Sequence, residues 1–413
     1  MISTEELFNI LLLVAIALLF TRILGFLFHK LKQPVVIGEI IAGIVLGAVS
    51  VYVFSGQKFI FFNYIVTPPN LSELFQSPEF TLFAEIGILF LLFISGLETS
   101  LSKLKKTEKA SSFVAVGGVI MPLLLGFLSG IILGFSVIES VMIGLILTAT
   151  SVGVTVRTLM DLHVLNTDVG ATILGGAVID DIIGIILLTF ALGIGSLIDA
   201  VWIGVKIAIF FLVFLYLGLK VIDKVLFIGE KINLPKSFLS ITLAILLLYS
   251  FFADEAGISG IIGAFVAGIL IGQNVRSKKI IDDIKAIGYG FFIPIFFFSV
   301  GLSLWTSENV EISSFSNILI FIIIIISMSI IGKIVGCGIG AKLSGMSNLE
   351  SLQVSVGMIP RMELALIIVT AAISHGILTG QVAHTVLLTT ILLTIITSLI
   401  TPFLIKATFK NDK

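Results

Sequence analysis

Apolar stretches of about twenty residues recur along this chain from end to end. Each is long enough to cross the roughly 30 Å hydrocarbon core of a bilayer. Composition agrees, since 58% of the 413 residues are hydrophobic and only 12% are charged, whereas a soluble domain carries about a quarter charged residues. The 39 glycines and 9 prolines also suit transmembrane helices, which tolerate both residue types. The sequence therefore predicts an all-α polytopic membrane protein, folded as a single membrane domain over 1–413.

Hydropathy predicts thirteen spans, and the loop charges support that number. When loops are assigned to alternate sides, nearly all lysines and arginines fall on one side and the other side receives only Lys58. By the positive-inside rule, the N-terminus is expected outside and the C-terminus in the cytoplasm. The expected spans are 6–27, 34–54, 80–98, 110–134, 138–157, 170–196, 200–222, 236–253, 257–273, 286–304, 314–341, 351–375 and 382–405.

Three short segments of the chain resemble later segments seven spans further on. GEIIAGIVLG at 38–47 matches GAFVAGILIG at 263–272, SGL at 95–97 matches VGL at 300–302, and SVGVTVR at 151–157 matches SVGMIPR at 355–361. Because seven is odd, the two copies would cross the bilayer in opposite senses. This is the inverted-repeat pattern of secondary transporters, whose binding sites lie near the membrane midplane.

Adjacent carboxylates, Asp180 and Asp181, stand in the middle of the apolar span 170–196. A charge at mid-span is costly and usually functional. Neighbours on a helix point about 100° apart, so one acid can pair with a cation while the other faces an aqueous cavity. Lys333, in the otherwise apolar span 314–341, is the expected cation partner of Asp180. The alternative is a purely structural ion pair that ties two helices together.

Two other spans carry signs of a helix broken near the midplane. Thr148, Thr150 and Ser151 lie in span 138–157, and Gly357 to Pro360 lie in span 351–375. Pro360 has no N–H to donate and is expected to free the carbonyl of Val356. Broken helices present carbonyls and dipole ends to ions, so Glu363 is expected to offset the N-terminus of the second half-helix, unless it simply pairs with Arg361 or another core charge.

Taken together, these residues suit a site where a small cation and a proton compete for the same carboxylate oxygens. A coupled antiporter fits best. A channel needs a continuous selectivity lining, an organic-anion symporter would not need the Asp–Asp–Lys trio, and an aspartyl protease needs its two acids on different helices. The histidines show no metal-ligand spacing, and a net charge of −1 gives no reason to expect nucleic acid. We expect no enzyme activity and no cofactor, with the cation and the proton as substrates.

The combined motifs resemble the monovalent cation:proton antiporter-2 family, in its sodium/proton antiporter branch. They include QPVVIGEIIAGIVLG (33–47), TATSVGVTVR (148–157), LGGAVIDDIIG (174–184), GKIVGCG (332–338) and GMIPRMELALI (357–367). The resemblance implies a prokaryotic cell-membrane exchanger of Na⁺ or Li⁺ for H⁺, with a K⁺/H⁺ antiporter or a K⁺ efflux system of the same family as the alternative. It implies Na⁺ and proton binding at Asp181, an Asp180–Lys333 pair, a contribution from Thr150, and electrogenic transport.

The same resemblance implies a homodimer whose ion-transport core moves by alternating access against a dimerisation part. The core is expected over about 110–196 and 314–405, and the dimerisation part over about 1–100 and 236–305. A linker helix is expected over about 200–222. The support of the two discontinuous helices is expected from Thr148, Ser151, Pro360, Arg361 and Glu363.

Overall fold

The structure, a computed structural model, describes residues 4–50, 59–61, 64–66, 77–192, 197–232, 234–305 and 315–409. It is helical apart from one short antiparallel hairpin, β1 (Phe59–Phe61) and β2 (Tyr64–Val66), in which Phe59 lies opposite Val66. The hairpin falls in the predicted loop between 54 and 80 and was not expected. The α-helices are α1 (Thr4–Lys30), α2 (Val35–Val49), α4 (Pro78–Glu98), α5 (Leu101–Ile132), α6 (Val137–Thr148), α7 (Val152–Asp161), α8 (Asp168–Ala191), α9 (Leu197–Phe210), α10 (Tyr216–Lys231), α11 (Ser237–Glu255), α12 (Gly260–Gly272), α13 (Ile281–Ile287), α14 (Ile293–Leu302), α15 (Phe315–Leu343), α16 (Asn348–Gly357), α17 (Glu363–Ser374) and α18 (Gly380–Phe409).

Two stretches of π-helix interrupt otherwise continuous helices. One covers Phe211–Leu215 between α9 and α10, and the other covers Gly288–Phe292 between α13 and α14. Contacts divide the chain into two compact units: residues 1–90 with 285–311, and residues 91–284 with 312–413. Two of the three boundaries fall inside α4 and α13, and each unit is described by itself.

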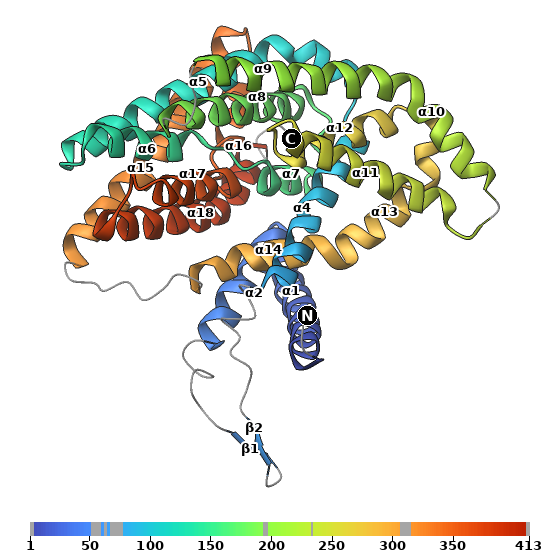
Figure 1. The fold of residues 1–413 in the computed structure, drawn as a ribbon, viewed down its shortest axis with the longest axis horizontal. Helices are drawn as coiled ribbons and strands as arrows, with labels where there is room; N and C mark the ends of the chain where they lie inside the picture. The colour runs from blue at the N-terminus through green and yellow to red at the C-terminus, as the bar shows by residue number, and fades with distance from the viewer. Residues whose placement is uncertain are drawn as a thin grey trace. The chain divides into compact units, whose positions relative to one another are not determined.

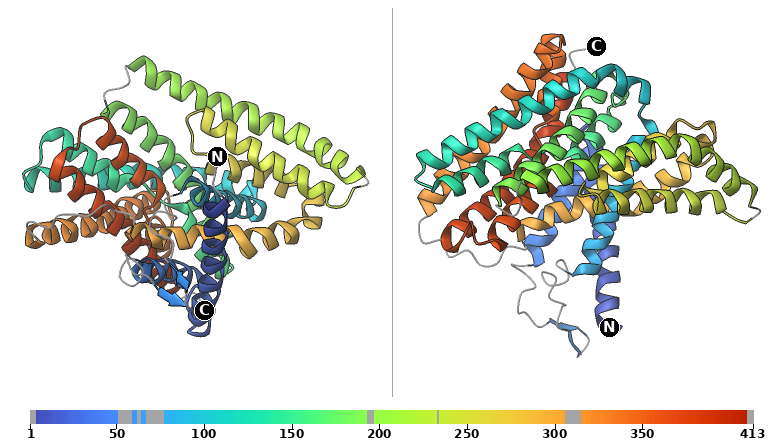
Figure 2. Two further views of the ribbon diagram at one scale, coloured as in Figure 1. Left: turned by 60° about the horizontal axis from the view of Figure 1, so that its bottom comes forward. Right: turned by 45° about the horizontal axis from the view of Figure 1, so that its top comes forward.

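The first unit packs α1, α2 and α14 together (Figure 2), and the first part of α4 joins them through the contact of Phe80 with Phe298. Its core contains Leu13, Ala42, Phe80 and Phe298, all essentially buried. Helices α2 and α14 approach closely at Gly43, where an added Cβ would lie 2.0 Å from the carbonyl oxygen of Phe298 and 3.0 Å from the Cα of Gly301. In a bilayer, such contacts between small residues hold helices together because lipid chains give no hydrophobic drive for association.

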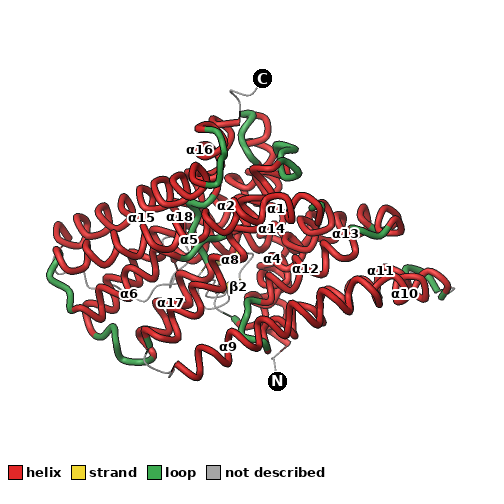
Figure 3. Tube along the Cα trace, turned by 90° about the horizontal axis from the view of Figure 1, so that it is seen from above, coloured by secondary structure: helices red, strands yellow, loops and turns green. Residues whose placement is uncertain are grey.

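The second unit holds a bundle of α5, α6, α8 and α15 to α18, seen in Figure 1. Helix α15 lies against α5 through a glycine stripe, and a Cβ at Gly336 would lie 2.1 Å from the carbonyl oxygen of Gly117. The segment from Gly336 to Gly340 is therefore a helix-packing surface, although its glycine spacing resembles that of a phosphate-binding loop. Helices α10 and α11 of the same unit run side by side (Figure 3).

The internal repeat is visible as matched contacts in the two units. In the first unit Gly43 of α2 meets Gly301 of α14, and in the second unit Gly268 of α12 meets Gly96 of α4. Gly43 and Gly268 are corresponding positions in the first pair of matched segments, and Gly96 and Gly301 correspond in the second pair. The nearest backbone atoms correspond too, with added Cβ atoms 3.0 Å from the facing glycine Cα in both cases.

Every predicted span coincides with one helix or with consecutive helices, so the all-α prediction is confirmed for the part of the chain that the structure describes. Within that part, nine helices are long and apolar enough to cross a membrane, and a bent pair over Gly204–Leu215 and Gly218–Gly229 makes a tenth. Three shorter apolar helices, Val35–Val49, Gly260–Gly272 and Leu364–Ser374, fall in further predicted spans. The number thirteen and the orientation of the termini stay predictions.

Candidate ion-binding site

Two spans of the second unit are broken, and both begin with the same local device. Ser136 caps α6 and Ser347 caps α16, each accepting a hydrogen bond from the backbone N–H of a glutamate three residues later while that glutamate accepts from the cap N–H. This capping box satisfies N–H groups that a helix start otherwise leaves unpaired. The first span breaks at residues 149–151 and the second at residues 358–362.

The helix starts align the two broken spans with each other at an offset of 211 residues. It relates Ser136 to Ser347 (347 minus 136) and the first residue of α7, Val152, to the first residue of α17 (363 minus 152). In this register Thr150 corresponds to Arg361. Aligning SVGVTVR with SVGMIPR by their similar residues instead gives an offset of 204 residues (355 minus 151). That offset differs from 211 by seven residues, or two helical turns. That residue-level match is wrong, although the correspondence between the two spans stands.

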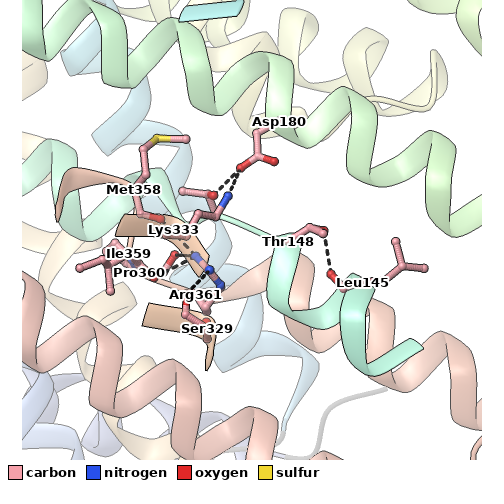
Figure 4. Close-up of polar contacts among 10 residues, drawn as sticks. Leu145, Thr148, Asp180, Ser329, Lys333, Met358, Ile359, Pro360 and Arg361 are labelled. Atoms are coloured by element: carbon pink, nitrogen blue, oxygen red, sulfur yellow. Dashed lines mark hydrogen bonds and ion pairs between the residues drawn. The ribbon is translucent and has the colours of Figure 1, made fainter. Parts of the chain in front are cut away.

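At the first break, Asp180 of α8 forms a buried ion pair with Lys333 of α15 (Figure 4). Lys333 Nζ lies 2.7 Å from Asp180 Oδ2, and the two side chains are 0% and 1% exposed. The same oxygen accepts a hydrogen bond from the Thr150 hydroxyl. Three elements, α8, α15 and the first break, therefore meet at one carboxylate oxygen.

The two acids lie in different environments, as expected for adjacent helical residues. Asp180 is buried, whereas Asp181 is half-buried. Asp180 Oδ1 makes no hydrogen bond to any residue that the structure describes. A buried oxygen without a donor costs roughly 1–3 kcal/mol, and this oxygen is therefore available to a small cation or a proton.

The space around the Lys333 ammonium is set by glycine. A Cβ at Gly118 of α5 would lie 3.2 Å from Lys333 Nζ and 2.7 Å from the sulfur of Cys337, which is fully buried one turn further along α15. Any larger residue at 118 would push on both side chains. The close α5–α15 packing therefore positions the Lys333 ammonium as well as helix α15.

At the second break, Arg361 is fully buried and binds backbone carbonyls (Figure 4). Its Nη1 donates to the carbonyl oxygens of Met358, Ile359 and Pro360 at 3.1, 2.9 and 3.4 Å. Its Nη2 lies 3.4 Å from the carbonyl oxygen of Ser329, one turn before Lys333 on α15. A cation at carbonyls that follow the end of α16 is favourable, because the C-terminus of a helix carries partial negative charge.

The two breaks are tied directly to each other. The Ser151 N–H donates to the carbonyl oxygen of Pro360 at 2.8 Å. The Thr155 hydroxyl, in the first turn of α7, donates to the carbonyl oxygen of Gly357 at 2.7 Å. Backbone groups freed by one break are thus partly satisfied by the other.

Several predicted support roles differ in detail from the structure. The expectation that Pro360 frees the carbonyl of Val356 is wrong, because the Ile359 N–H donates to that carbonyl at 3.2 Å. Thr148 does not reach the ion pair: its hydroxyl donates to the carbonyl of Leu145 on its own helix at 2.7 Å. Glu363 is the first residue of α17, and its side chain lies outside what the structure describes.

Sequence reasoning missed three residues of the site: Thr155, Ser329 and Thr397. The Thr397 hydroxyl accepts a hydrogen bond from the Arg361 N–H at 3.1 Å. A signal for it was present, because span 382–405 carries a stripe of hydroxyl residues at helical spacing. The buried hydroxyl residues of that span are Thr389, Thr390, Thr394, Thr397, Ser398 and Thr401.

The fold and the site together define a polytopic secondary transporter with two discontinuous helices and a buried carboxylate–ammonium pair. The family model described as "Sodium/hydrogen exchanger, transmembrane" matches residues 14–407. The chain therefore belongs to the sodium/hydrogen exchanger family.

Individual relatives agree with this assignment. The chain is 36% identical to the Na(+)/H(+) antiporter of Enterococcus hirae over 368 residues, which are 88% of each chain. It is 33% identical to the Na(+)/H(+)-K(+) antiporter GerN of Bacillus cereus over 367 residues, again 88% of each. The solved structure of the sodium proton antiporter MjNhaP1 from Methanocaldococcus jannaschii at pH 8 covers 98% of each chain, with a TM-score of 0.63 and 18% identity, and so shares the fold. The protein is thus a multi-pass cell-membrane transporter and not an enzyme.

Proposed function

We propose that this protein exchanges Na⁺ or Li⁺ for H⁺ across a prokaryotic cell membrane by alternating access. The observation that carries the proposal is the buried Asp180–Lys333 pair next to the half-buried Asp181. Sodium/proton antiport is also the activity that the names of several relatives state.

The chemistry follows from competition at oxygen atoms. Asp181, the more exposed acid, is the proposed carrier of Na⁺ or of a proton. Asp180 holds Lys333 through Oδ2 and offers Oδ1 to the arriving cation. When a cation binds, the carboxylates are shared between it and the ammonium, which weakens the ion pair and favours loss of a proton. No resident cofactor takes part in this scheme.

Two further features belong to the proposal. The protein is a homodimer, with a dimerisation part over about 1–100 and 236–305, a core over about 110–196 and 314–405, and a linker over about 200–222. The core contains both breaks and the ion pair, so the groups proposed to bind the substrates move together. The mass of the protein in lipid nanodiscs tests the dimer, and a monomeric mass would contradict it.

The test of transport is proton movement in proteoliposomes that carry an imposed pH gradient and a luminal pH dye. Sodium or lithium is expected to dissipate the gradient. Asp181→Asn should lower the rate at least about 100-fold, because it removes the titratable group that binds the cation. The matched control is Asp168→Asn at the start of α8, where an exposed acid pairs with Lys106.

Three outcomes would decide against parts of the proposal. Wild-type protein without any cation-dependent proton movement is not an antiporter. Full activity in Asp181→Asn moves the binding site elsewhere. A response to potassium alone replaces sodium by potassium as the substrate, which is the alternative that the sequence left open.

Electrogenic exchange is proposed because Asp180 and Lys333 supply a second group that can gain and lose a proton. A membrane potential of 100 mV changes the driving force by about 2.3 kcal/mol per net charge moved. Wild-type transport should therefore respond to an imposed potential, whereas Lys333→Gln should retain slower exchange that is independent of potential. Equal wild-type rates at zero and at imposed potential would show electroneutral exchange instead.

A further inference from the structure

A second polar site lies in the first unit, at the end of α1. A pocket of about 230 Å³ is lined by Thr21, Arg22, Gly25, Phe26, His29 and Val35. On α1 these residues follow a helical spacing of three, four and seven, so they share one face of the helix. The Val35 that closes the pocket is the first residue of α2.

The position of Arg22 needs a physical reason. It is exposed and lies eight residues before the end of a membrane-spanning helix, about 12 Å along the helix axis from Lys30. Its Nη2 donates to the carbonyl of Tyr289. That contact uses one of five N–H donors and fixes the guanidinium at the pocket, which leaves donors for an anion.

The surroundings of the pocket are basic at one end and apolar at the other. From residue 22 to residue 38 the chain carries Arg22, His29, Lys30 and Lys32, and the next residue, Glu39, is acidic but fully buried. On the same helix Leu19, Ile23, Phe26 and Leu27 are exposed, with exposed fractions from 45% to 64%. A ligand here must offer a negative group to the cations and tolerate an apolar wall.

We propose that this pocket binds the phosphate headgroup of an anionic membrane phospholipid. Guanidinium groups bind phosphate through paired, charge-assisted hydrogen bonds, and basic pockets between transmembrane helices are known lipid headgroup sites. Arg22 holds the phosphate, His29 hydrogen-bonds a second oxygen of the headgroup, and the apolar side chains of α1 contact the acyl chains. The site is separate from the Asp180–Lys333 pair and does not depend on the transported cation.

The test is lipid binding to the full-length, delipidated protein in detergent. Thermal stabilisation is titrated with phosphatidylglycerol and, in parallel, with zwitterionic phosphatidylcholine. We expect phosphatidylglycerol to stabilise the wild type and the double variant Arg22→Gln/His29→Gln to lower its apparent affinity about tenfold, the size of one charge-assisted bond. His29→Gln alone, which leaves the Arg22–Tyr289 contact intact, should lower it by a smaller factor.

Lys206→Gln is the matched control, because Lys206 is also an exposed cation inside an apolar helix of the protein. It should bind phosphatidylglycerol as the wild type does. Equal responses of the wild type to the two lipids would overturn the proposal, and so would an equal loss of affinity in Lys206→Gln. Stabilisation by inorganic phosphate alone, without any lipid preference, would assign the pocket to a soluble anion and would also overturn it.

Discussion

The two broken spans have the same backbone plan and opposite chemistry. Both start at a serine–glutamate capping box and both resume their second helix at the same distance from it, at Val152 and at Glu363. At corresponding positions in the breaks, however, one has Thr150 and the other has Arg361. The hydroxyl of Thr150 points to a carboxylate of another helix, whereas the guanidinium of Arg361 binds carbonyls of its own break.

The difference shows how a symmetric fold can hold an asymmetric site. The first break is open to an acid and contributes a polar side chain to it. The second break is closed by its own buried cation, which repels a further cation and stabilises the carbonyls that the break leaves outside helical hydrogen bonds. Of the two corresponding side chains, Thr150 of the first break is the one that donates a hydrogen bond to Asp180.

The largest expected effect is a loss of stability that differs between the two buried arginines of the broken spans. Arg361→Gln leaves several buried carbonyls without a charged donor and should cost about 3 kcal/mol of stability. Arg157→Gln removes a buried arginine that pairs with Asp161 on the same helix, at 3.3 Å, and should cost less. Apparent melting temperatures in detergent measure both, and equal losses would show that Arg361 has no special role in its break.

A smaller effect is expected from the threonine of the first break. Thr150→Val removes the hydroxyl that donates to Asp180 at almost constant volume and should slow cation-dependent proton transport about tenfold, or roughly 1.4 kcal/mol. Thr148→Val is the control, since that hydroxyl donates to Leu145 of its own helix, and it should change the rate less than twofold. Similar transport rates in both variants would show that Thr150 does not contribute to the site.

The smallest expected effect concerns the tie between the two breaks. Thr155→Val removes the hydrogen bond to Gly357 and should cost about 1 kcal/mol of stability. Thr158→Val on the same helix removes a hydroxyl that donates to Val154 at 2.8 Å within the helix and should cost almost nothing. If melting temperatures do not distinguish these variants, the hydroxyl contact between the spans does not contribute to stability.

Part of this site was predictable because its charged residues stand in otherwise apolar segments. Asp180, Asp181 and Lys333 are charges in apolar helices, and few arrangements can place such charges in a membrane. The hydrogen bond to the Val356 carbonyl near Pro360 and the role of Thr148 were not predictable in the same way. Hydroxyls in membrane helices often bond to their own backbone, and a carbonyl four residues before a proline can find another donor within a turn, as Val356 does.

The register of the repeat shows the same limit. Similar text at 151–157 and 355–361 indicated the correct pair of spans but the wrong alignment of residues. Glycine-rich apolar segments match each other by chance, whereas the capping boxes at 136–139 and 347–350 mark helix starts physically. The serine–glutamate pairs of those boxes are present in the sequence, and they give the better alignment of the two spans.

The amino-acid sequence by itself determined the all-helical membrane fold, the two broken spans and the short set of buried charges, because the hydrocarbon core restricts both backbone and charge so strongly. The pairing of Lys333 with Asp180 was expected from the sequence. Tertiary structure decided that Lys333 and Thr150 share one oxygen of Asp180 and that Arg361 closes the second break. These choices depend on distances between helices far apart in the chain. Such distances are set by glycine contacts such as those of Gly117 with Gly336, which no local pattern specifies.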